Sequence, residues 1–453
     1  MNTSNHRPWY RRIGPGLITA CVVIGPGSIV TSSTVGATHG YSMLWIVLLA
    51  VSLQITFMTL ASRLGSIDSQ SIGDMLRTEG KPLLALAVGI CVFFISAAFQ
   101  SGNNVGVASV FQTLLESEGL NDSWLTPACV ILFNAVAITF LFAFRDLYQL
   151  VERTMMFLVA MMLACFTINL IVLKPEPTKI LEGFIPRLDL LDINTLGLVG
   201  TTFVVAAAFY QAYLVRQKGW TQKDVESGSV DVWIGGAVMG LITMMLMATA
   251  AAGLYQEGGS TVSLSNPVEI AKALEPTFGQ TGKFIFCLGL FSAAYSSFLV
   301  NSMIGGFILS DGLSLGCDPQ SKWPRLLTTL TLLVGMFIAL AAMVFKLDPA
   351  PTIIAANAVT VVGSPLIAIV LVWLSHKKAI FETYSWSFVI QRLTDLGIIM
   401  LLVMAFKTAV VTIPNKIDQY RNQPSEQPEE LPKEPSSISR NPDQNFPEQS
   451  SMR

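Results

Sequence analysis

The sequence predicts an all-α polytopic membrane protein, and three observations lead to this fold class. Of the 453 residues, 52% are hydrophobic and only 13% are charged. Apolar runs of about 20 residues, the length that crosses a bilayer as a helix, recur along the chain, and no soluble class has such a composition. The third observation is a helix-breaking sequence inside the first of these runs. The net charge of −2 argues against a nucleic-acid partner.

The apolar runs predict eleven helices and three regions. Residues 1–12 form an N-terminal segment, and residues 13–413 form one membrane domain. Residues 414–453 are rich in Pro, Glu, Ser, Gln and Asn, cannot bury enough surface to fold and are expected to be disordered. The predicted helices lie near residues 13–37, 41–63, 83–114, 125–144, 152–173, 194–215, 230–255, 278–310, 326–346, 350–375 and 391–413. Within the long connection 257–280, residues 268–274 predict a short separate helix at the membrane interface.

The distribution of Lys and Arg predicts the orientation. If the N-terminus is cytoplasmic, sixteen Lys and Arg residues fall on the cytoplasmic side and five on the opposite side. Such a bias sets the topology of membrane proteins. We therefore expect an integral protein of the inner or plasma membrane with a cytoplasmic N-terminus, whose surroundings are the lipid bilayer. The sequence does not indicate an oligomeric state.

The first helix is interrupted by Gly25-Pro26-Gly27-Ser28. Proline lacks the amide that would continue the helix, and the two glycines disfavour helix further. We expect the break near the middle of the bilayer. Backbone groups freed there cannot face lipid, so they must line an enclosed site or bind a ligand. A broken helix at mid-membrane is typical of a transporter's binding site. The alternative is a plain proline kink in a packed helix.

Ten of the eleven helices fit two sets of five in opposite orientations, helices 1–5 and 6–10, with an eleventh added. In such inverted repeats the first helix of each half is broken, and the two breaks face each other. The centre of helix 6, residues 201–211, contains neither proline nor glycine. Its residues alone therefore do not predict a second break.

Several motifs together resemble the Nramp (SLC11) family of divalent-metal transporters. They occur in the family's order and span almost the whole membrane region: Gly14-Pro15-Gly16 before the break, Gly40-Tyr41-Ser42-Met43-Leu44-Trp45, Phe144-Arg145-Asp146-Leu147, Gly200-Thr201-Thr202, Trp323-Pro324-Arg325-Leu326-Leu327-Thr328, and Pro365 with Lys377-Lys378. The resemblance implies a LeuT-type inverted-repeat fold and transport of a divalent metal ion.

The chain departs from this family at the residues that bind metal and carry protons. The family's helix 1 aspartate and asparagine correspond to Gly25 and Ser28, and its helix 6 Met-Pro-His corresponds to Val204-Val205-Ala206, within a residue or two. Acidic residues on the family's helix 3 proton path correspond to Gln100 and Asn103, and a second histidine on helix 6 corresponds to Gln211. These departures resemble a magnesium-transporting branch related to Nramp.

The predicted site therefore lacks sulfur and carboxylate ligands. Soft thioethers favour transition metals, whereas magnesium prefers oxygen ligands and retains several waters. We expect a hard, partly hydrated cation such as magnesium or manganese, not coupled to protons, and no tightly bound structural metal. The predicted binding residues are Gly25, Ser28, Thr201, Thr202, Val204 and Asn357, and the predicted permeation residues are Gln100, Asn103 and Gln211.

Polar residues inside the predicted helices allow more than one interpretation. Those of helices 3 and 8 either line a hydrated path or form interhelical hydrogen bonds. Asp231 is expected to cap the helix that it begins. The alternative function is a carrier of a small organic solute such as an amino acid, whose carboxylate would bind the free amides at the break. No nucleophile–base pair indicates an enzyme, and no motif indicates a cofactor.

Overall fold

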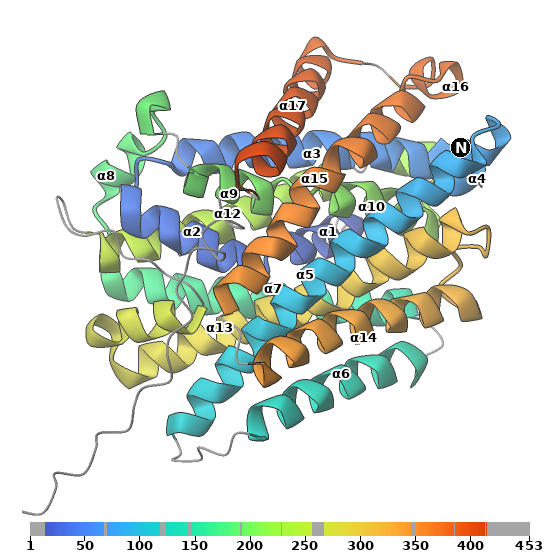
Figure 1. Ribbon diagram of the computed structural model, residues 1–453. Helices are drawn as coiled ribbons and strands as arrows, with labels where there is room; N and C mark the ends of the chain where they lie inside the picture. Colours follow the sequence, from blue (N-terminus) through green and yellow to red (C-terminus); the bar gives the residue numbers. More distant parts are fainter. Residues whose placement is uncertain are drawn as a thin grey trace, which may run out of the picture.

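The protein is a bundle of helices in the computed structural model (Figure 1). The structure describes residues 14–67, 70–117, 124–143, 147–190, 193–227, 229–255, 267–345, 349–384, 386–412 and 414. The main helices are α1 (Pro15–Val23), α2 (Pro26–His39), α3 (Leu44–Ile67), α5 (Pro82–Ser117), α6 (Leu125–Ala143), α7 (Leu147–Leu173), α9 (Ile193–Thr202), α10 (Val205–Gln217), α12 (Ser229–Leu254), α13 (Pro267–Gly312), α14 (Lys322–Val344), α15 (Pro349–Ser375) and α17 (Phe388–Lys407). The short connecting helices are α4 (Ile72–Thr78), α8 (Pro177–Glu182), α11 (Gln222–Ser227) and α16 (Lys378–Phe381), with 3-10 and π turns at Leu188–Leu190 and Thr408–Thr412.

Each of the eleven predicted helices overlaps a helix, or a broken pair of helices, in the structure. Among the described residues, nine helices are long and apolar enough to cross a membrane, and the bent pair α1–α2 makes a tenth span. Val359–Ser375 of α15 is apolar but shorter. Residues 268–274, predicted as a short helix at the membrane interface, are helical, but they are the first turns of α13, which runs unbroken from Pro267 to Gly312. The predicted N-terminal segment and polar tail lie almost wholly outside the described residues.

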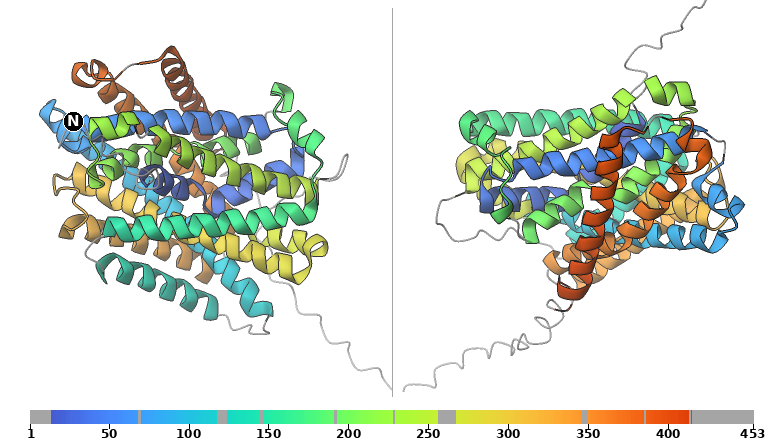
Figure 2. Two further views of the ribbon diagram at one scale, coloured as in Figure 1. Left: turned by 180° about the vertical axis from the view of Figure 1, so that it is seen from behind. Right: turned by 90° about the horizontal axis from the view of Figure 1, so that it is seen from above.

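The two halves of the chain pack helix against corresponding helix. The first span contacts the sixth through α1 and α10 and through α2 and α9, the second contacts the seventh through α3 and α12, and the third contacts the eighth through α5 and α13. The fourth and ninth spans, α6 and α14, lie side by side along one edge, and α17 lies at the opposite edge (Figures 1 and 2). This pairing is the inverted-repeat arrangement. It places the two interrupted spans at the centre, where every residue of α1 is buried.

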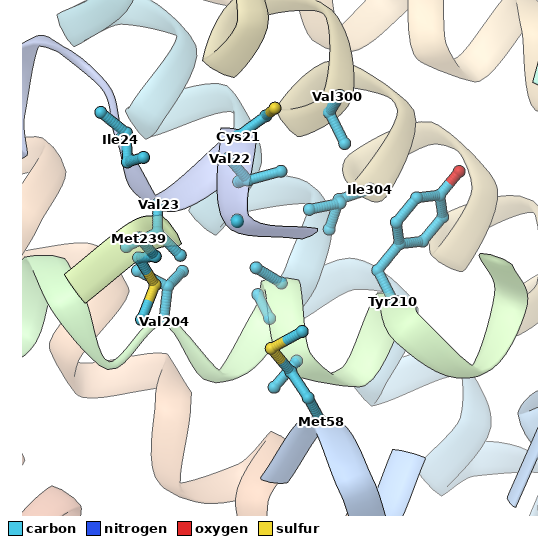
Figure 3. Packing of buried hydrophobic residues seen from close by; sticks show 14 of the residues in the cluster. Cys21, Val22, Val23, Ile24, Met58, Val204, Tyr210, Met239, Val300 and Ile304 are labelled. Carbon is cyan, nitrogen blue, oxygen red and sulfur yellow. The ribbon is translucent and has the colours of Figure 1, made fainter. Parts of the chain in front are cut away.

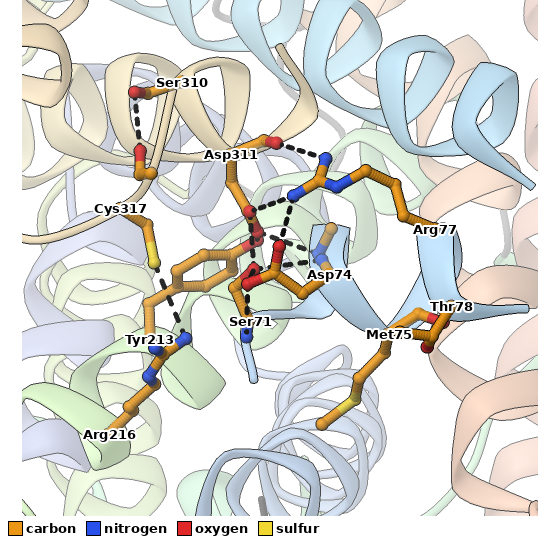
Figure 4. A network of polar contacts seen from close by, with 12 residues as sticks. Ser71, Asp74, Met75, Arg77, Thr78, Tyr213, Arg216, Ser310, Asp311 and Cys317 are labelled. Atoms are coloured by element: carbon orange, nitrogen blue, oxygen red, sulfur yellow. Dashed lines mark hydrogen bonds and ion pairs between the residues drawn. The ribbon is translucent and has the colours of Figure 1, made fainter. Parts of the chain in front are cut away.

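A buried carboxylate, Asp311 at the end of α13, ties three elements together (Figure 4). Its oxygens accept hydrogen bonds from Ser71 Oγ at 2.6 Å, Gly73 N at 2.8 Å and Tyr213 Oη at 2.7 Å. Arg77 forms an ion pair with Asp311 Oδ1 at 3.3 Å and donates to the Asp311 carbonyl at 2.8 Å. This one side chain therefore fixes α4 and α10 against α13.

We predict that Asp311→Asn loosens this end of the bundle. Replacing the charged acceptor should destabilise the fold by about 2 kcal/mol. The alkylation rate of nearby Cys317 reports the change. Burial raises the pKa of this thiol to about 12, and Arg216 Nη1 lies 3.7 Å from its sulfur. At neutral pH this thiol is protonated and should be alkylated slowly, and the variant should react faster. Mass spectrometry of the Cys317 peptide measures the rate.

The matched control is Asp395→Asn, whose carboxylate forms an exposed ion pair with Arg392 at 3.5 Å. Such a surface change should alter stability by less than about 0.5 kcal/mol. If both variants melt and alkylate like the wild type, Asp311 does not hold these elements together.

Candidate functional site

The predicted break in the first span is present. α1 ends at Val23 and α2 begins at Pro26, and the two helices are bent by 62°. Ser28 stabilises the turn, because its Oγ accepts from Gly25 N at 3.0 Å and donates to the Gly25 carbonyl at 2.9 Å. The free backbone groups of the break are therefore partly satisfied from within the motif itself.

The last carbonyls of α1 are satisfied by α13. Ser297 Oγ donates to the Val22 carbonyl at 3.1 Å, and Ser296 Oγ lies 3.5 Å from the Cys21 carbonyl. The last carbonyls of a helix have no partner within that helix. Inside an apolar bundle they need a donor from elsewhere, and buried Ser297 supplies one to Val22, whereas the hydroxyl of Ser296 lies closer, at 3.1 Å, to the Ala293 carbonyl of its own helix.

The sixth span is also interrupted. α9 ends at Thr202 and α10 begins at Val205, with Val204 in an extended conformation at φ −98° and ψ 92°. Phe203, between the two helices, is buried and packs edge-on against Phe57 with ring centroids 5.0 Å apart. The two interrupted spans meet at a hydroxyl pair, because Thr31 Oγ1 of α2 and Thr201 Oγ1 of α9 are 2.8 Å apart.

One wall of the central region is apolar. Val204, predicted as a binding residue, belongs to the buried cluster drawn in Figure 3, together with Val23, Met58 and Met239. All four side chains are at most 3% exposed. Val204 thus marks the break but offers no polar side-chain ligand. The thioethers of Met58 and Met239 in this cluster were not predicted from the sequence.

The side of the break that faces α5 and α13, called here the polar wall, is lined by polar groups. A Cβ atom built on Gly25 would lie 2.8 Å from Ser297 Oγ and 3.4 Å from Asn103 Oδ1. Asn103 Nδ2 lies 3.4 Å from Ser297 Oγ and also 3.4 Å from Gln100 Oε1. The structure therefore brings together Gly25, Asn103 and Gln100 of the predicted site, and it adds Ser297. Ser28 belongs to the same turn as Gly25.

Hydrogen bonds between helices account for much of the polar run. Asn301 Nδ2 of α13 donates to the Ser96 carbonyl of α5 at 2.8 Å, and Asn134 Nδ2 of α6 donates to Asn104 Oδ1 at 2.7 Å. These contacts support the interhelical interpretation for Asn104 and Asn301. Gln100 differs, because its Nε2 is buried and lacks a partner among the described atoms. Thr202 Oγ1 at the end of α9 is likewise buried and lacks a partner among the described atoms.

Gln211 lies at the first turn of α1, away from the break. Its side-chain amide is 2.6 Å from Thr19 Oγ1, and with the amide nitrogen on that side it also donates to the Pro15 carbonyl at 2.9 Å. Its place on a permeation path stays a prediction. Asn357 lies in α15, and its side chain is outside the described part of the structure.

Asp231 does not cap its own helix as expected. It is fully buried, and its two oxygens accept from Gly14 N at 2.7 Å and Gly16 N at 2.6 Å. These are free amides at the start of α1, where a carboxylate also interacts favourably with the helix dipole. The expectation failed because a free N-terminus in the neighbouring helix competes for the same carboxylate. Asp231 anchors α1 to α12.

The lining of the break carries no charge in the parts of the chain that the structure describes. Across these ranges no three His, Cys, Asp or Glu side chains converge on a common point. The polar groups at the break are hydroxyls, amides and backbone carbonyls.

Comparison with known protein families and sequences assigns the chain to a family. The family model described as natural resistance-associated macrophage protein-like (Nramp) matches residues 16–411. The chain belongs to the Nramp family. Divalent metal cation transporter MntH of Chromohalobacter salexigens is 24% identical over 384 residues, covering 82% of this chain and 84% of the relative. MntH of Pectobacterium carotovorum is 24% identical over 395 residues, covering 86% and 92%.

Solved structures show the same fold. The manganese transporter of Eremococcus coleocola superposes with a TM-score of 0.76 at 16% identity, covering 94% of this chain and 91% of that chain. MhsT, solved with L-phenylalanine, superposes with a TM-score of 0.53 at 15% identity, covering 87% and 98%. The predicted LeuT-type inverted repeat is therefore confirmed for this Nramp protein.

Sequence reasoning missed Ser297 and its neighbour Ser296, although a signal was present. Two adjacent serines stand near the middle of an apolar helix, where each hydroxyl must find an acceptor. A hydroxyl can bond to its own helix, so this signal does not predict which helix end the pair contacts. Only the packing of α13 against α1 reveals the acceptor.

We predict that Asp231→Ala frees α1. Two buried backbone amides lose a charged acceptor, which should lower the free energy of unfolding by about 3 kcal/mol. Thermal unfolding in detergent, followed by tryptophan fluorescence, measures the change. Asp224→Ala is the control, because this carboxylate accepts from Thr221 N at 3.0 Å in an exposed turn. Loss of such a cap costs about 1 kcal/mol. Equal losses for the two variants would refute the anchoring role.

Proposed function

We propose that this Nramp protein transports a divalent metal cation across a membrane, and that the ion is hard and partly hydrated, such as magnesium or manganese. The observation that carries the proposal is the break at Gly25, whose polar wall consists of neutral oxygens from Ser28, Ser297 and Asn103. Relatives along most of the chain are named divalent metal cation transporters, which supports the cation class over an organic solute.

The donor chemistry supports the choice of a hard ion. Magnesium releases its waters reluctantly and binds to proteins through few direct ligands. Hydroxyl, amide and carbonyl oxygens can contact its water shell without the cost of burying a carboxylate. Transport of softer ions by direct coordination would call for a thioether or thiolate. The thioethers of Met58 and Met239 stand on the apolar wall, packed in the core.

The same polar wall supports transport without proton coupling. A coupled carrier needs a group inside the membrane that gains and loses a proton, and Gln100 and Asn103 cannot do so. The buried carboxylate Asp231 accepts hydrogen bonds from two backbone amides at the start of α1. It therefore has a structural role in this arrangement.

The placement in the cell follows from the charge distribution. With sixteen Lys and Arg residues on one side and five on the other, we propose an inner- or plasma-membrane protein with a cytoplasmic N-terminus. Its partners are the transported cation and the bilayer. Accessibility of cysteines introduced into the N-terminal segment, measured in intact cells, tests the orientation.

Uptake into proteoliposomes tests the function. Magnesium or manganese should accumulate, and a panel of amino acids should not. Gly25→Leu should abolish uptake while leaving membrane insertion intact, because a side chain there meets Ser297 and Asn103. Gly102→Leu, on α5, is the control, since a Cβ there meets nothing within 4 Å. Normal uptake by Gly25→Leu would remove the site from the break, and uptake of an amino acid alone would favour the organic-solute carrier.

Proton coupling is tested with a pH-sensitive dye trapped in the vesicles. Metal influx should leave the lumenal pH unchanged, since the wall of the break offers no titratable group. A metal-dependent proton flux well above that of empty liposomes would contradict the uncoupled mechanism. Asp231→Asn and His39→Gln would then identify the carrier.

Selectivity should respond to the family's missing ligands. Gly25→Asp together with Val204→Met places a carboxylate and a thioether at the two interrupted spans, which favours cadmium over magnesium. Ser297 must move to admit the new side chain, so Ser297→Gly is included as a third change. The wild-type protein should bind cadmium weakly by calorimetry. Binding at low micromolar affinity would contradict the hard-ion proposal, and Met239→Leu would then show whether the native thioether is the ligand.

A further inference from the structure

Ser297 occupies a special position on α13. Its hydroxyl lies between the Val22 carbonyl at the end of α1, 3.1 Å away, and the Asn103 amide of α5, 3.4 Å away. All three residues are at most 2% exposed. Three helices from both halves of the repeat therefore converge on one hydroxyl beside the break.

This hydroxyl and the Asn103 oxygen face the position where a side chain at residue 25 would begin. A Cβ atom on Gly25 would lie 2.8 Å from Ser297 Oγ and 3.4 Å from Asn103 Oδ1. Because residue 25 is glycine, neutral oxygens from other helices line this side of the break. Gln100 extends the wall, since its Oε1 lies 3.4 Å from Asn103 Nδ2 and its Nε2 is a buried polar atom with no partner among the described residues.

The electrostatics of the wall favour a cation. The carbonyl of Val22 is at the C-terminal end of α1, where the helix dipole carries partial negative charge. C-terminal ends of broken helices and their free carbonyls are known cation-binding elements in membrane carriers. The cluster with Val23, Val204 and Met239 is apolar and offers no such carbonyl or hydroxyl side chain. A hydrated cation in the break is therefore attracted to the side formed by α1, α5 and α13.

We propose that Ser297 and Asn103, with the Val22 carbonyl, form the surface that contacts the cation and determines its preference for hard ions. This inference rests on the proposed function and assigns contact with the ion, and its selectivity, to one residue each of α13 and α5. The hydroxyl turns its lone pairs toward the ion or its water shell when the ion binds, and in the ion-free state it donates to Val22.

Substitution of Ser297 by cysteine tests the proposal with little change in shape. A thiol is a soft ligand and a poor partner for magnesium. In proteoliposomes, Ser297→Cys should raise the ratio of cadmium to magnesium uptake about tenfold, which corresponds to about 1.4 kcal/mol of discrimination. Ser297→Ala should raise the KM for magnesium about five- to tenfold, the loss expected for one buried polar contact.

The controls are serines on the same helices. Ser302 of α13 bonds to the Leu299 carbonyl of its own helix at 2.7 Å, and Ser101 of α5 bonds to the Ala98 carbonyl at 2.7 Å. Ser302→Cys and Ser101→Ala should leave selectivity and KM unchanged. Melting temperatures of all variants separate ion binding from folding. If Ser297→Ala is unstable, Ser297→Cys and Asn103→Ser carry the test.

The outcomes separate this inference from the proposed function. If the wild-type protein transports magnesium or manganese and the Ser297 and Asn103 variants match the Ser302 and Ser101 controls, the inference is wrong and the function stands. If the wild-type protein transports no divalent cation, both are wrong. If the ratio of cadmium to magnesium uptake rises in Ser297→Cys and not in Ser302→Cys, the inference is confirmed.

Discussion

The break between α1 and α2 imposes the constraint on which the rest of the structure depends. Polar backbone groups freed inside an apolar bundle cost several kcal/mol each unless they are satisfied. Here Ser28 satisfies the start of α2, and Ser297 donates to the Val22 carbonyl at the end of α1. The need for these donors explains why serines occupy the middle of a buried helix.

Two buried aspartates hold the helices around this break. Asp231 binds the first amides of α1, and Asp311 binds α4 and α10 to the end of α13. Asp231 accepts hydrogen bonds from two backbone amides, and Asp311 accepts from one backbone amide and two hydroxyls, all from elements far away in the sequence. The half-helices α1 and α10, which border the site, are thus fixed by charged acceptors at the ends farthest from their breaks.

The sequence alone predicted the fold class, the helices and the first break, because apolar length and Gly-Pro-Gly act locally. It did not predict the second break. Phe203 and Val204 carry no helix-breaking chemistry, and packing of Phe203 on Phe57 accompanies the interruption. The same limit applies to the site. Gly25 and Ser28 were predicted from the motif. The contact of Ser297 with α1, and the bonds that Asp231 accepts from the first amides of α1, depend on which helices pack together. Gln211 was predicted by family correspondence to lie on the permeation path, and only the structure shows that it contacts Thr19 and Pro15 of α1.

The departure from the family's metal ligands acquires a physical meaning in this arrangement. A glycine at position 25 lets α5 and α13 approach the break and present neutral oxygens, while Val204 keeps the other side apolar. A polar wall and an apolar wall together suit an ion that keeps its own water. Under the proposed function, selectivity comes from the size of the hydrated ion and from the oxygens that contact its shell.

The most direct test of this account is the position of a bound ion. Manganese serves as the probe, because its anomalous scattering locates it in crystals of the full chain soaked with the metal. The account predicts a manganese peak on the polar side of the break, next to Gly25, Ser297 and Asn103, with protein oxygens mostly beyond the roughly 2.1 Å of direct coordination. A peak at the thioethers of Met58 and Met239, or at Asp231, would contradict it.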